Sequence, residues 1–442
     1  MIKNKLKVLP LIALLALTSL IEFKALKRYT DDVLLRSGFQ VEKSLQEKVK
    51  EENLKALEGE EEYQKIIDLE NDDNDSSKMP SQAEEVKDLR LRALSALLLD
   101  ASNNRVLYEE NGYNRMPNAS TTKIMTCIVA LEKGNLDEVV TVSSYAASMP
   151  DVQLNVKAGE QYYLGDLLYS LMLESHNDVA VAIAEHIGGS VEDFAVMMND
   201  KARLLGCDDT NFVTPSGLDA EQHYTTARDL AVIASYAIKN ERFIKITNAQ
   251  THSFKEINNK RSFTVSNKNR FLYMMDGAIG VKTGFTGRAG YCFVGAVKRS
   301  DRTLISVVLG CGWPPNKNLK WTDTKNLMNY GLENYEVKQI FKPVTFEPIQ
   351  VKNGQERYLP LSLTGDLTML IRKDEVVSVE YELPDYVEAP IEANSIIGHA
   401  HYYIDDKLYY ILPIYADNSV EKIDFKFCFR QILNLWMNMI GE

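Results

Sequence analysis

Ser120 and Lys123 are the first residues in this chain whose types and spacing could do chemistry. Pro117, and the hydroxyl residues after it, precede an apolar helical pattern at residues 124–131, which predicts that a helix begins here. Residues three apart lie on one face of a helix, so the amine would lie beside the hydroxyl. A serine hydroxyl needs a nearby base to act as a nucleophile, and a lysine with a lowered pKa can supply one. Taken alone, the pattern is weak, and a capped, solvated helix start is by far the commoner explanation.

Two further polar segments interrupt or border regular apolar patterns. A Ser-His-Asn segment at residues 175–177 breaks the helical periodicity of residues 165–187. A Lys-Thr-Gly segment at residues 282–284 comes just before a strand-like pattern. A helix start, a break between helices and the approach to a strand can each direct polar groups into one cleft. The occurrence of all three segments, in order and widely spaced, predicts a single site.

The patterns around these segments predict the elements that must hold them in place. A buried strand at residues 94–99 turns at 102–104 into a strand at 106–108, and a second hairpin joins residues 290–297 and 303–309. Helical periodicity covers four segments between the hairpins, at residues 120–131, 165–187, 191–205 and 225–238. Helices between a first and a last hairpin predict an α/β domain whose mainly antiparallel sheet is closed by its two ends.

Composition excludes several classes of function. The 442 residues are 45% hydrophobic and carry a net charge of -12, which argues against a nucleic-acid partner. The five cysteines are scattered without a CxxC pair, so neither a disulfide framework nor a zinc cluster is expected. His399 and His401 share a strand face without another ligand nearby, and we expect ordinary surface residues there. Phosphate-binding and dinucleotide motifs are absent, and we expect no metal and no cofactor.

The N-terminal residues predict export. Lys3, Lys5 and Lys7 precede an apolar run at residues 8–21, which is typical of a secretory signal. The run is shorter than the ~20 residues that span a bilayer, and no clean cleavage site follows it, so residues 1–25 are either a signal peptide or a signal anchor. Residues 26–90 are charged, partly helical and partly disordered in pattern, which predicts a tether.

The C-terminal part predicts a small all-β domain at residues 339–417 and an amphipathic helix at residues 418–442. The helix carries apolar residues on one face and cations on another: Phe425, Phe429, Ile432, Leu433, Trp436 and Ile440 against Lys422, Lys426 and Arg430. Two interpretations remain open. The helix either lies on a membrane surface with its apolar face buried, or it packs on the β domain and completes its core.

With these three polar segments, the sequence resembles the low-molecular-mass penicillin-binding proteins, specifically the serine-type D-alanyl-D-alanine carboxypeptidases (peptidase S11-like). The resemblance covers residues 93–335 and includes three longer motifs, Ala-Leu-Leu-Leu-Asp-Ala at 96–101, Pro-Ser-Gly-Leu at 215–218 and the extended Lys-Thr-Gly segment at 276–286. It implies a β-lactamase/transpeptidase-like domain at residues 91–338, with a five-stranded sheet flanked by helices. It also implies removal of the terminal D-Ala from peptidoglycan stem peptides and inhibition by β-lactams. The export signal and the C-terminal helix predict a location at the outer face of the cytoplasmic membrane or cell wall.

The resemblance implies a role for each polar segment. Ser120 attacks the carbonyl of the D-Ala-D-Ala bond, Lys123 is the general base, and Lys282 lowers the pKa of that base. Ser175 relays a proton to the leaving amine. Asn177 holds the substrate amide and the lysine amine.

The remaining roles concern substrate binding. Lys282 and Thr283 bind the terminal carboxylate, and Gly284 lets the strand approach the substrate closely. Backbone N–H groups of Ser120 and Phe285 form the oxyanion hole. The middle residue of the second segment is variable in the family, so no catalytic role is expected for it. Further candidates for the carboxylate site do not map cleanly onto the family pattern: Lys268, Arg270 and Lys320.

Three alternatives stay open at this point. A β-lactamase of class A would need a deacylating glutamate, and residues 211–226 offer only Asp219 and Glu221 in a carboxypeptidase-like context. A DD-endopeptidase or transpeptidase would use the same acyl-enzyme. A non-catalytic peptidoglycan-binding protein would lack the nucleophile or the base, and neither is missing.

Overall fold

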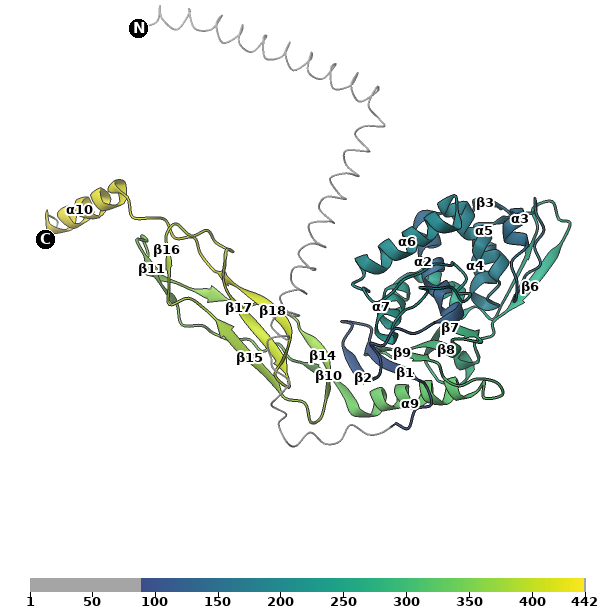
Figure 1. Ribbon diagram of the computed structural model, residues 1–442. Helices are drawn as coiled ribbons and strands as arrows, with labels where there is room; N and C mark the ends of the chain where they lie inside the picture. Colours follow the sequence, from purple (N-terminus) through teal and green to yellow (C-terminus); the bar gives the residue numbers. More distant parts are fainter. Residues whose placement is uncertain (1–88, 441–442) are drawn as a thin grey trace, which may run out of the picture. The chain divides into compact units, whose positions relative to one another are not determined.

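The structure is a computed structural model that describes residues 89–440, and the side chains as far as residue 437 (Figure 1). The predicted signal segment and nearly all of the predicted tether lie outside the described residues. The described chain forms two compact units. One contains the residues up to Pro343 together with Gly365–Glu375, and the other contains Val344–Thr364 and the chain from Val376 onward.

A five-stranded antiparallel sheet organises the first unit. Its strand order is β2-β1-β9-β8-β7, so the two ends of the domain pair in the middle of the sheet. The strands are β1 (Ser95–Asp100), β2 (Val106–Glu110), β7 (Ala278–Thr286), β8 (Gly290–Lys298) and β9 (Thr303–Leu309). Both predicted hairpins are confirmed, and so is the antiparallel sheet that they close.

Helices cover the two faces of this sheet (Figure 1). On β1, Leu97 and Leu99 pack toward the larger helical layer, while Ala96 and Leu98 pack toward α9, because side chains alternate along a strand. The helices of the unit are η1 (Ala119–Thr122), α2 (Lys123–Lys133), α3 (Ser144–Ala147), α4 (Leu164–Leu173), α5 (Asn177–Gly188), α6 (Val191–Leu204), α7 (Ala227–Ala237), α8 (Glu241–Asn248), η2 (Arg270–Tyr273) and α9 (Leu319–Asn334). Two small ribbons complete it, β3 (Val139–Thr141) with β4 (Gln161–Tyr163), and β5 (Thr251–Lys255) with β6 (Ser262–Ser266).

One strand of the sheet was not predicted. The Lys-Thr-Gly segment comes before the predicted strand at β8, as expected, but it also lies within a strand of its own, β7, which pairs with β8 through Lys282↔Val294 and Gly284↔Cys292. The period-2 signal is hidden because β7 is buried over much of both faces and contains two glycines. Helix α9, helix α8 and the β5–β6 ribbon carry patterns from which no element was predicted.

The second unit is all-β apart from its terminal helix, as predicted. It holds a three-stranded sheet, of order β12-β11-β16, and a four-stranded sheet, of order β13-β18-β17-β15. Its strands are β11 (Ile349–Lys352), β12 (Tyr358–Leu359), β13 (Leu361–Ser362), β15 (Val377–Glu382), β16 (Tyr386–Glu388), β17 (Ile396–Ile404) and β18 (Lys407–Ala416). Strand β14 (Thr368–Arg372) pairs instead with β10 (Tyr335–Gln339), and both belong to the first unit.

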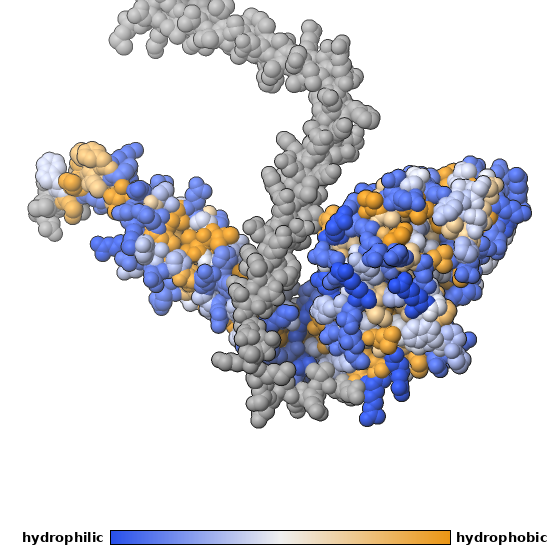
Figure 2. Space-filling view, viewed as in Figure 1, coloured by the Kyte–Doolittle hydropathy of each residue, from blue (hydrophilic) through white to orange (hydrophobic). Residues whose placement is uncertain are grey.

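Helix α10 (Phe425–Ile440) exposes its apolar side chains. Phe425 is 85% exposed, and Ile432 and Trp436 are 65% and 62% exposed. Figure 2 shows the apolar colour of this helix at the surface of its unit. In the described part of the chain, no helix combines the length and the hydropathy needed to cross a bilayer.

Candidate active site

Ser120 lies in η1, one turn before α2, where the chain bends ahead of the long helix. Ala119 adopts a φ of 48°, which bends the backbone into the short 3-10 turn that carries Ser120. Lys123 is the first residue of α2 and is completely buried. Its Nζ lies 2.9 Å from the Ser120 Oγ, so the local spacing places amine and hydroxyl in hydrogen-bond contact.

Two further hydrogen-bond partners of the Lys123 amine determine how the protons of that amine are distributed. Its Nζ lies 2.8 Å from the Asn177 Oδ1 and 2.5 Å from the backbone oxygen of Ser216. Both oxygens can only accept hydrogen bonds. A neutral amine has two protons and one lone pair. When the two protons go to these acceptors, the lone pair is left for the Ser120 hydroxyl, which is the arrangement that a general base requires.

The electrostatics of the site favour that neutral amine. Burial lowers the pKa of Lys123 well below its usual value, the positive charge of Lys282 lowers it further, and Asp178 opposes the shift. Burial also lowers the pKa of Lys282, to about 7. The first two polar segments therefore form one hydrogen-bonded cluster, and Lys282 of the third acts on it through its charge.

Asn177 begins α5, directly after the break that follows α4. Its Nδ2 donates to the carbonyls of Pro150 and Asp151, both at 3.2 Å, which fixes the amide with its oxygen toward Lys123. The predicted contact of this side chain with a substrate amide would have to replace one of these two bonds.

Ser175 occupies an unusual position in the same break. It adopts a φ of 72°, a left-handed conformation that is uncommon for a residue other than glycine. Its Oγ is buried and has no hydrogen-bond partner among the described residues. Nearly all buried hydroxyls are paired, so a strained residue with an unpaired hydroxyl indicates a functional position.

His176 stabilises the break between α4 and α5, and its ring contacts neither Ser120 nor Lys123. One ring nitrogen lies 2.7 Å from the Ser170 Oγ, and the other lies 3.4 Å from the Glu174 carboxylate. Glu174 in turn pairs with Lys268 at 3.0 Å. Burial lowers the pKa of His176, so the ring is held neutral in this network.

Strand β7 brings the third segment against the turn that carries Ser120. A Cβ atom on Gly284 would lie only 3.1 Å from the backbone nitrogen of Ser120, so a side chain here would push the strand away. Lys282 is buried, and its Nζ donates to the carbonyl of Thr283 at 3.0 Å. Phe285 is exposed and packs against Tyr291, with ring centroids 4.6 Å apart.

The other three candidates for binding the substrate carboxylate lie in different surroundings. Lys268 forms the pair with Glu174, and Arg270 lies on the exposed part of η2. Lys320 is buried in α9, donates to the carbonyl of Lys317 at 2.6 Å and lies over the Tyr291 ring at 4.4 Å. Burial lowers the pKa of Lys320 to about 8. Among the described residues, no three His, Cys, Asp or Glu side chains are grouped closely enough to hold a metal ion.

Sequence reasoning missed several residues that complete the cluster. Ser216 contributes its carbonyl to Lys123, and Gly217 allows the close approach, since a Cβ there would lie 1.9 Å from the Ala119 oxygen. His223 contacts the Thr122 hydroxyl at 2.9 Å, and burial lowers its pKa to about 4, so the ring stays neutral. The Pro-Ser-Gly-Leu motif was the available signal for Ser216, whereas no local pattern indicated His223.

Comparisons with known proteins find similar sequences and similar folds. A family profile described as D-alanyl-D-alanine carboxypeptidase matches residues 80–312, and one described as penicillin-binding protein 5, C-terminal domain, matches residues 335–422. The chain is 32% identical to D-alanyl-D-alanine carboxypeptidase DacF of Bacillus subtilis, over 79% of this chain and 91% of that protein. The crystal structure of penicillin-binding protein 5 from Haemophilus influenzae is similar, with a TM-score of 0.63 and 28% identity, over 78% of this chain and 100% of that one. The Streptomyces K15 DD-transpeptidase has a TM-score of 0.52 and 32% identity, over 55% of this chain and 98% of that one.

Proposed function

Since the chain belongs to the D-alanyl-D-alanine carboxypeptidase family, we propose that Ser120 and Lys123 are the nucleophile and base with which it carries out this activity. The enzyme is a serine-type carboxypeptidase and a penicillin-binding protein. One observation carries the assignment of roles, the 2.9 Å contact between the Lys123 Nζ and the Ser120 Oγ. The two acceptor-only partners of the same amine support it, because they leave its lone pair facing the hydroxyl.

The reaction then proceeds in two halves. The Ser120 oxygen attacks the carbonyl carbon of the D-Ala-D-Ala bond while its proton moves to the Lys123 amine. The proton passes to the leaving nitrogen as the C–N bond breaks, and the terminal D-Ala departs. Water then attacks the ester carbonyl and gives a proton, through the Lys123 amine, to the Ser120 oxygen as the ester C–O bond breaks. The shortened peptide leaves with a new carboxyl group, and the Ser120 hydroxyl is restored. Backbone N–H groups of Ser120 and Phe285 stabilise the negative oxygen in both halves.

A test of the activity uses two probes on the purified protein. Fluorescent penicillin should label it covalently, and a peptide that ends in D-Ala-D-Ala should release free D-Ala. The same peptide with an amidated C-terminus should be cleaved far more slowly, because Lys282 and Thr283 would have no carboxylate to bind. Equal rates on both peptides would contradict the roles given to these residues and would favour an endopeptidase.

Ser175 is proposed to hand the proton to the leaving amine. Ser175→Ala should lower kcat for D-Ala release by about 10²–10⁴, as is typical for the loss of a proton-transfer group. The thermal stability of this variant should not fall, since the Ser175 hydroxyl forms no hydrogen bond with the described residues. Ser170→Ala is the matched control, because that buried hydroxyl is paired with His176 and its loss should cost about 1 kcal/mol of stability. Normal kcat in Ser175→Ala would contradict the relay.

The pH dependence follows from the two lysines. Only neutral Lys123 can accept the Ser120 proton, so kcat/KM should rise with pH through the pKa of that amine. Only charged Lys282 attracts the substrate carboxylate, and because its pKa is about 7, kcat/KM should fall as the pH rises above that value. The profile is therefore expected to be bell-shaped. Repeating it with Lys320→Arg tests whether Lys320 causes the alkaline limb, and a profile still rising at pH 9 would contradict the role of Lys282.

The location of the enzyme is also proposed, from both ends of the chain. The N-terminal apolar run supports export to the outer face of the cytoplasmic membrane. The apolar side chains of α10 are exposed, and the same helix carries Lys426 and Arg430. These features support a second, weaker attachment of the enzyme to the lipid surface. Burying such side chains contributes about 25 cal/mol per Å² of apolar area, which is enough for reversible attachment.

Truncation after Asp424 tests the role of α10. This end point keeps Val420, which is buried and pairs with Ile391, so the β domain should retain its thermal stability. Binding to anionic vesicles should be lost. A matched full-length variant, in which Phe429 and Trp436 are both replaced by serine, should weaken binding in the same direction. Unchanged vesicle binding with lower stability would instead show that the helix belongs to the core of the β domain.

A further inference from the structure

Glu174 lies in the break between α4 and α5, directly before Ser175, and the proposed mechanism does not use it. Its side chain is only 22% exposed. One carboxylate oxygen, Oε1, accepts a hydrogen bond from the backbone N–H of Ser266 at 3.0 Å and pairs with the Nζ of Lys268 at 3.0 Å. The other oxygen, Oε2, lies 3.4 Å from the Nε2 of His176. Both oxygens of the residue next to the proposed proton relay are thus engaged.

The segment that holds this carboxylate, residues 266–268, is itself fixed. Asn267 donates from its Nδ2 to two backbone carbonyls at the C-terminal end of α8, at 2.8 and 2.9 Å. The backbone N–H of Lys268 donates to the carbonyl of Leu173, the last residue of α4, at 3.1 Å. The break is therefore tied to this segment twice, through the side chain of Glu174 and through the backbone just before it.

Ser175 depends on such anchoring for its conformation. Within residues 89–437 it forms no hydrogen bond, either through its hydroxyl or through its backbone. A left-handed φ, here 72°, is unfavourable for a residue with a side chain and persists only where the surrounding structure enforces it. The conformation of Ser175 is thus set by its two neighbours, and Glu174 contacts both the fixed segment and the ring of His176.

The charge of Glu174 strengthens these contacts. Burial raises the pKa of its carboxyl group, but the hydrogen bonds from the Ser266 N–H and from Lys268 outweigh burial and hold the pKa below its usual value. The group is therefore an anion at neutral pH. Hydrogen bonds to an ionised acceptor are stronger than those between neutral groups, so the anion fixes the break more firmly than an amide would.

We propose that Glu174 is a positioning residue for the step in which the leaving amine is protonated. Its carboxylate fixes the backbone before Ser175, so that the unpaired hydroxyl faces the C–N bond that breaks. In that step Ser175 gives its proton to the leaving nitrogen and receives one from the Lys123 ammonium, which took it from Ser120. Glu174 contacts none of the reacting atoms and acts only through Ser175. The proposal rests on the proposed function, because that function makes Ser175 the relay.

Two substrates that differ only in the leaving group test this role. One is a peptide that ends in D-Ala-D-Ala, whose amine leaves only when it is protonated. The other is the matching thioester, whose thiolate departs without a proton. Glu174→Ala should lower kcat/KM on the peptide by about 10–100-fold, because the relay is misplaced, and should change kcat/KM on the thioester by less than about twofold. Glu174→Gln keeps the shape and one acceptor oxygen, so it should show the same selectivity with a smaller loss of stability.

Combination with Ser175→Ala gives a readout that loss of stability alone would not produce. Ser175→Ala should also slow the peptide more than the thioester. The double variant should be no slower on the peptide than Ser175→Ala by itself, because the missing hydroxyl is the group through which Glu174 acts. Effects that multiply in the double variant would overturn the proposal, and so would equal slowing of peptide and thioester in Glu174→Ala and Glu174→Gln.

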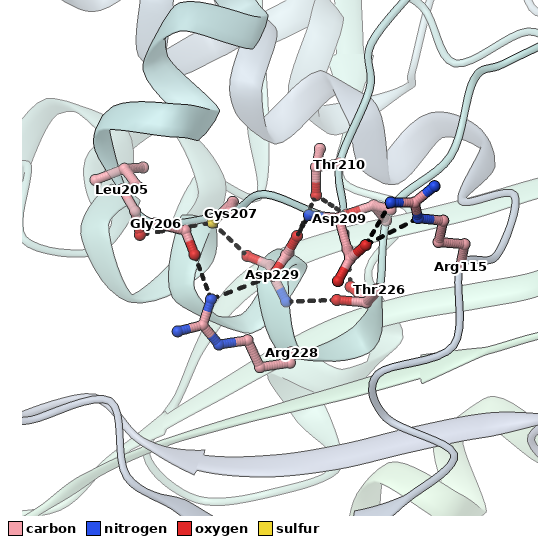
Figure 3. A network of polar contacts seen from close by, with 10 residues as sticks. Arg115, Leu205, Gly206, Cys207, Asp209, Thr210, Thr226, Arg228 and Asp229 are labelled. Carbon is pink, nitrogen blue, oxygen red and sulfur yellow. Dashed lines mark hydrogen bonds and ion pairs between the residues drawn. The ribbon is translucent and has the colours of Figure 1, made fainter. Parts of the chain in front are cut away.

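Asp209→Asn is the matched control. Its carboxylate also forms an ion pair in the same unit, since Arg115 donates to the Asp209 Oδ1 at 2.9 and 2.6 Å, but it lies between α6 and α7 and not in the break. Figure 3 shows this pair at the edge of a network that continues through Asp229. Asp209→Asn should leave kcat/KM on both substrates unchanged, because an exposed pair contributes little.

Failure of the proposed function looks different from failure of this inference. In that case the unmodified protein would neither bind penicillin covalently nor release D-Ala, or Ser175→Ala would keep normal kcat/KM on the peptide. If Ser175→Ala slows the peptide selectively while Glu174→Ala does not, the relay stands and the positioning role of Glu174 is refuted.

Discussion

Ser120→Ala is expected to abolish both covalent labelling by penicillin and release of D-Ala, a loss of at least about 10⁴-fold in rate. The structure shows why no neighbouring hydroxyl can substitute. Thr121 donates its hydroxyl proton to the Asn118 carbonyl at 2.6 Å, and Thr122 donates to the Ala119 carbonyl at 2.8 Å. Ser120 alone among these three contacts the Lys123 amine.

Two measurements make this result specific. Mass spectrometry of a penicillin-treated digest should find the adduct on the peptide that contains Ser120 and nowhere else. Ser144→Ala, at an exposed serine that begins α3, should be labelled as fast as the unmodified protein. Labelling of Ser120→Ala at another serine would refute the assignment.

Removing the base is expected to have the second largest effect. Lys123→Met keeps most of the buried volume but has no lone pair that can take the Ser120 proton. Acylation by penicillin should slow by about 10²–10⁴, or by more if serine and lysine act as a unit. The Asn177 and Ser216 oxygens would also lose their donor, at a cost of about 1–3 kcal/mol for each unpaired buried group.

That stability cost must be separated from the chemical effect. Thermal unfolding of Lys123→Met should show a lower Tm but a folded enzyme at the assay temperature, and acylation should be measured under those conditions. Lys133→Met, at the exposed end of the same helix, should change neither quantity. An unchanged acylation rate in folded Lys123→Met would leave the base role without support.

Sequence alone determined the features that depend on short-range geometry. Ser120 and Lys123 are three residues apart in a helix start, and that spacing brings an amine to a hydroxyl wherever the helix lies. The two hairpins follow from alternation and turn residues within a few positions. The three polar segments and their order carried the family resemblance, and with it the fold and activity that the comparisons support.

The tertiary structure decided how the three segments act together. The Ser216 carbonyl reaches Lys123 across 93 positions of the chain, and it does so only because Gly217 has no side chain to strike the Ala119 oxygen. The lowered pKa of Lys123 depends on complete burial and on Lys282, two properties that no local pattern encodes.

The same limit explains what sequence reasoning misplaced or overlooked. β7 is buried over much of both faces, so its sequence lacks the alternation that would have identified the Lys-Thr-Gly segment as part of a strand. Ser175 has an unpaired hydroxyl because no other described segment brings a partner near it. Residue types and spacing set what each group can do, whereas long-range packing sets its protonation, its partners and its access to a ligand.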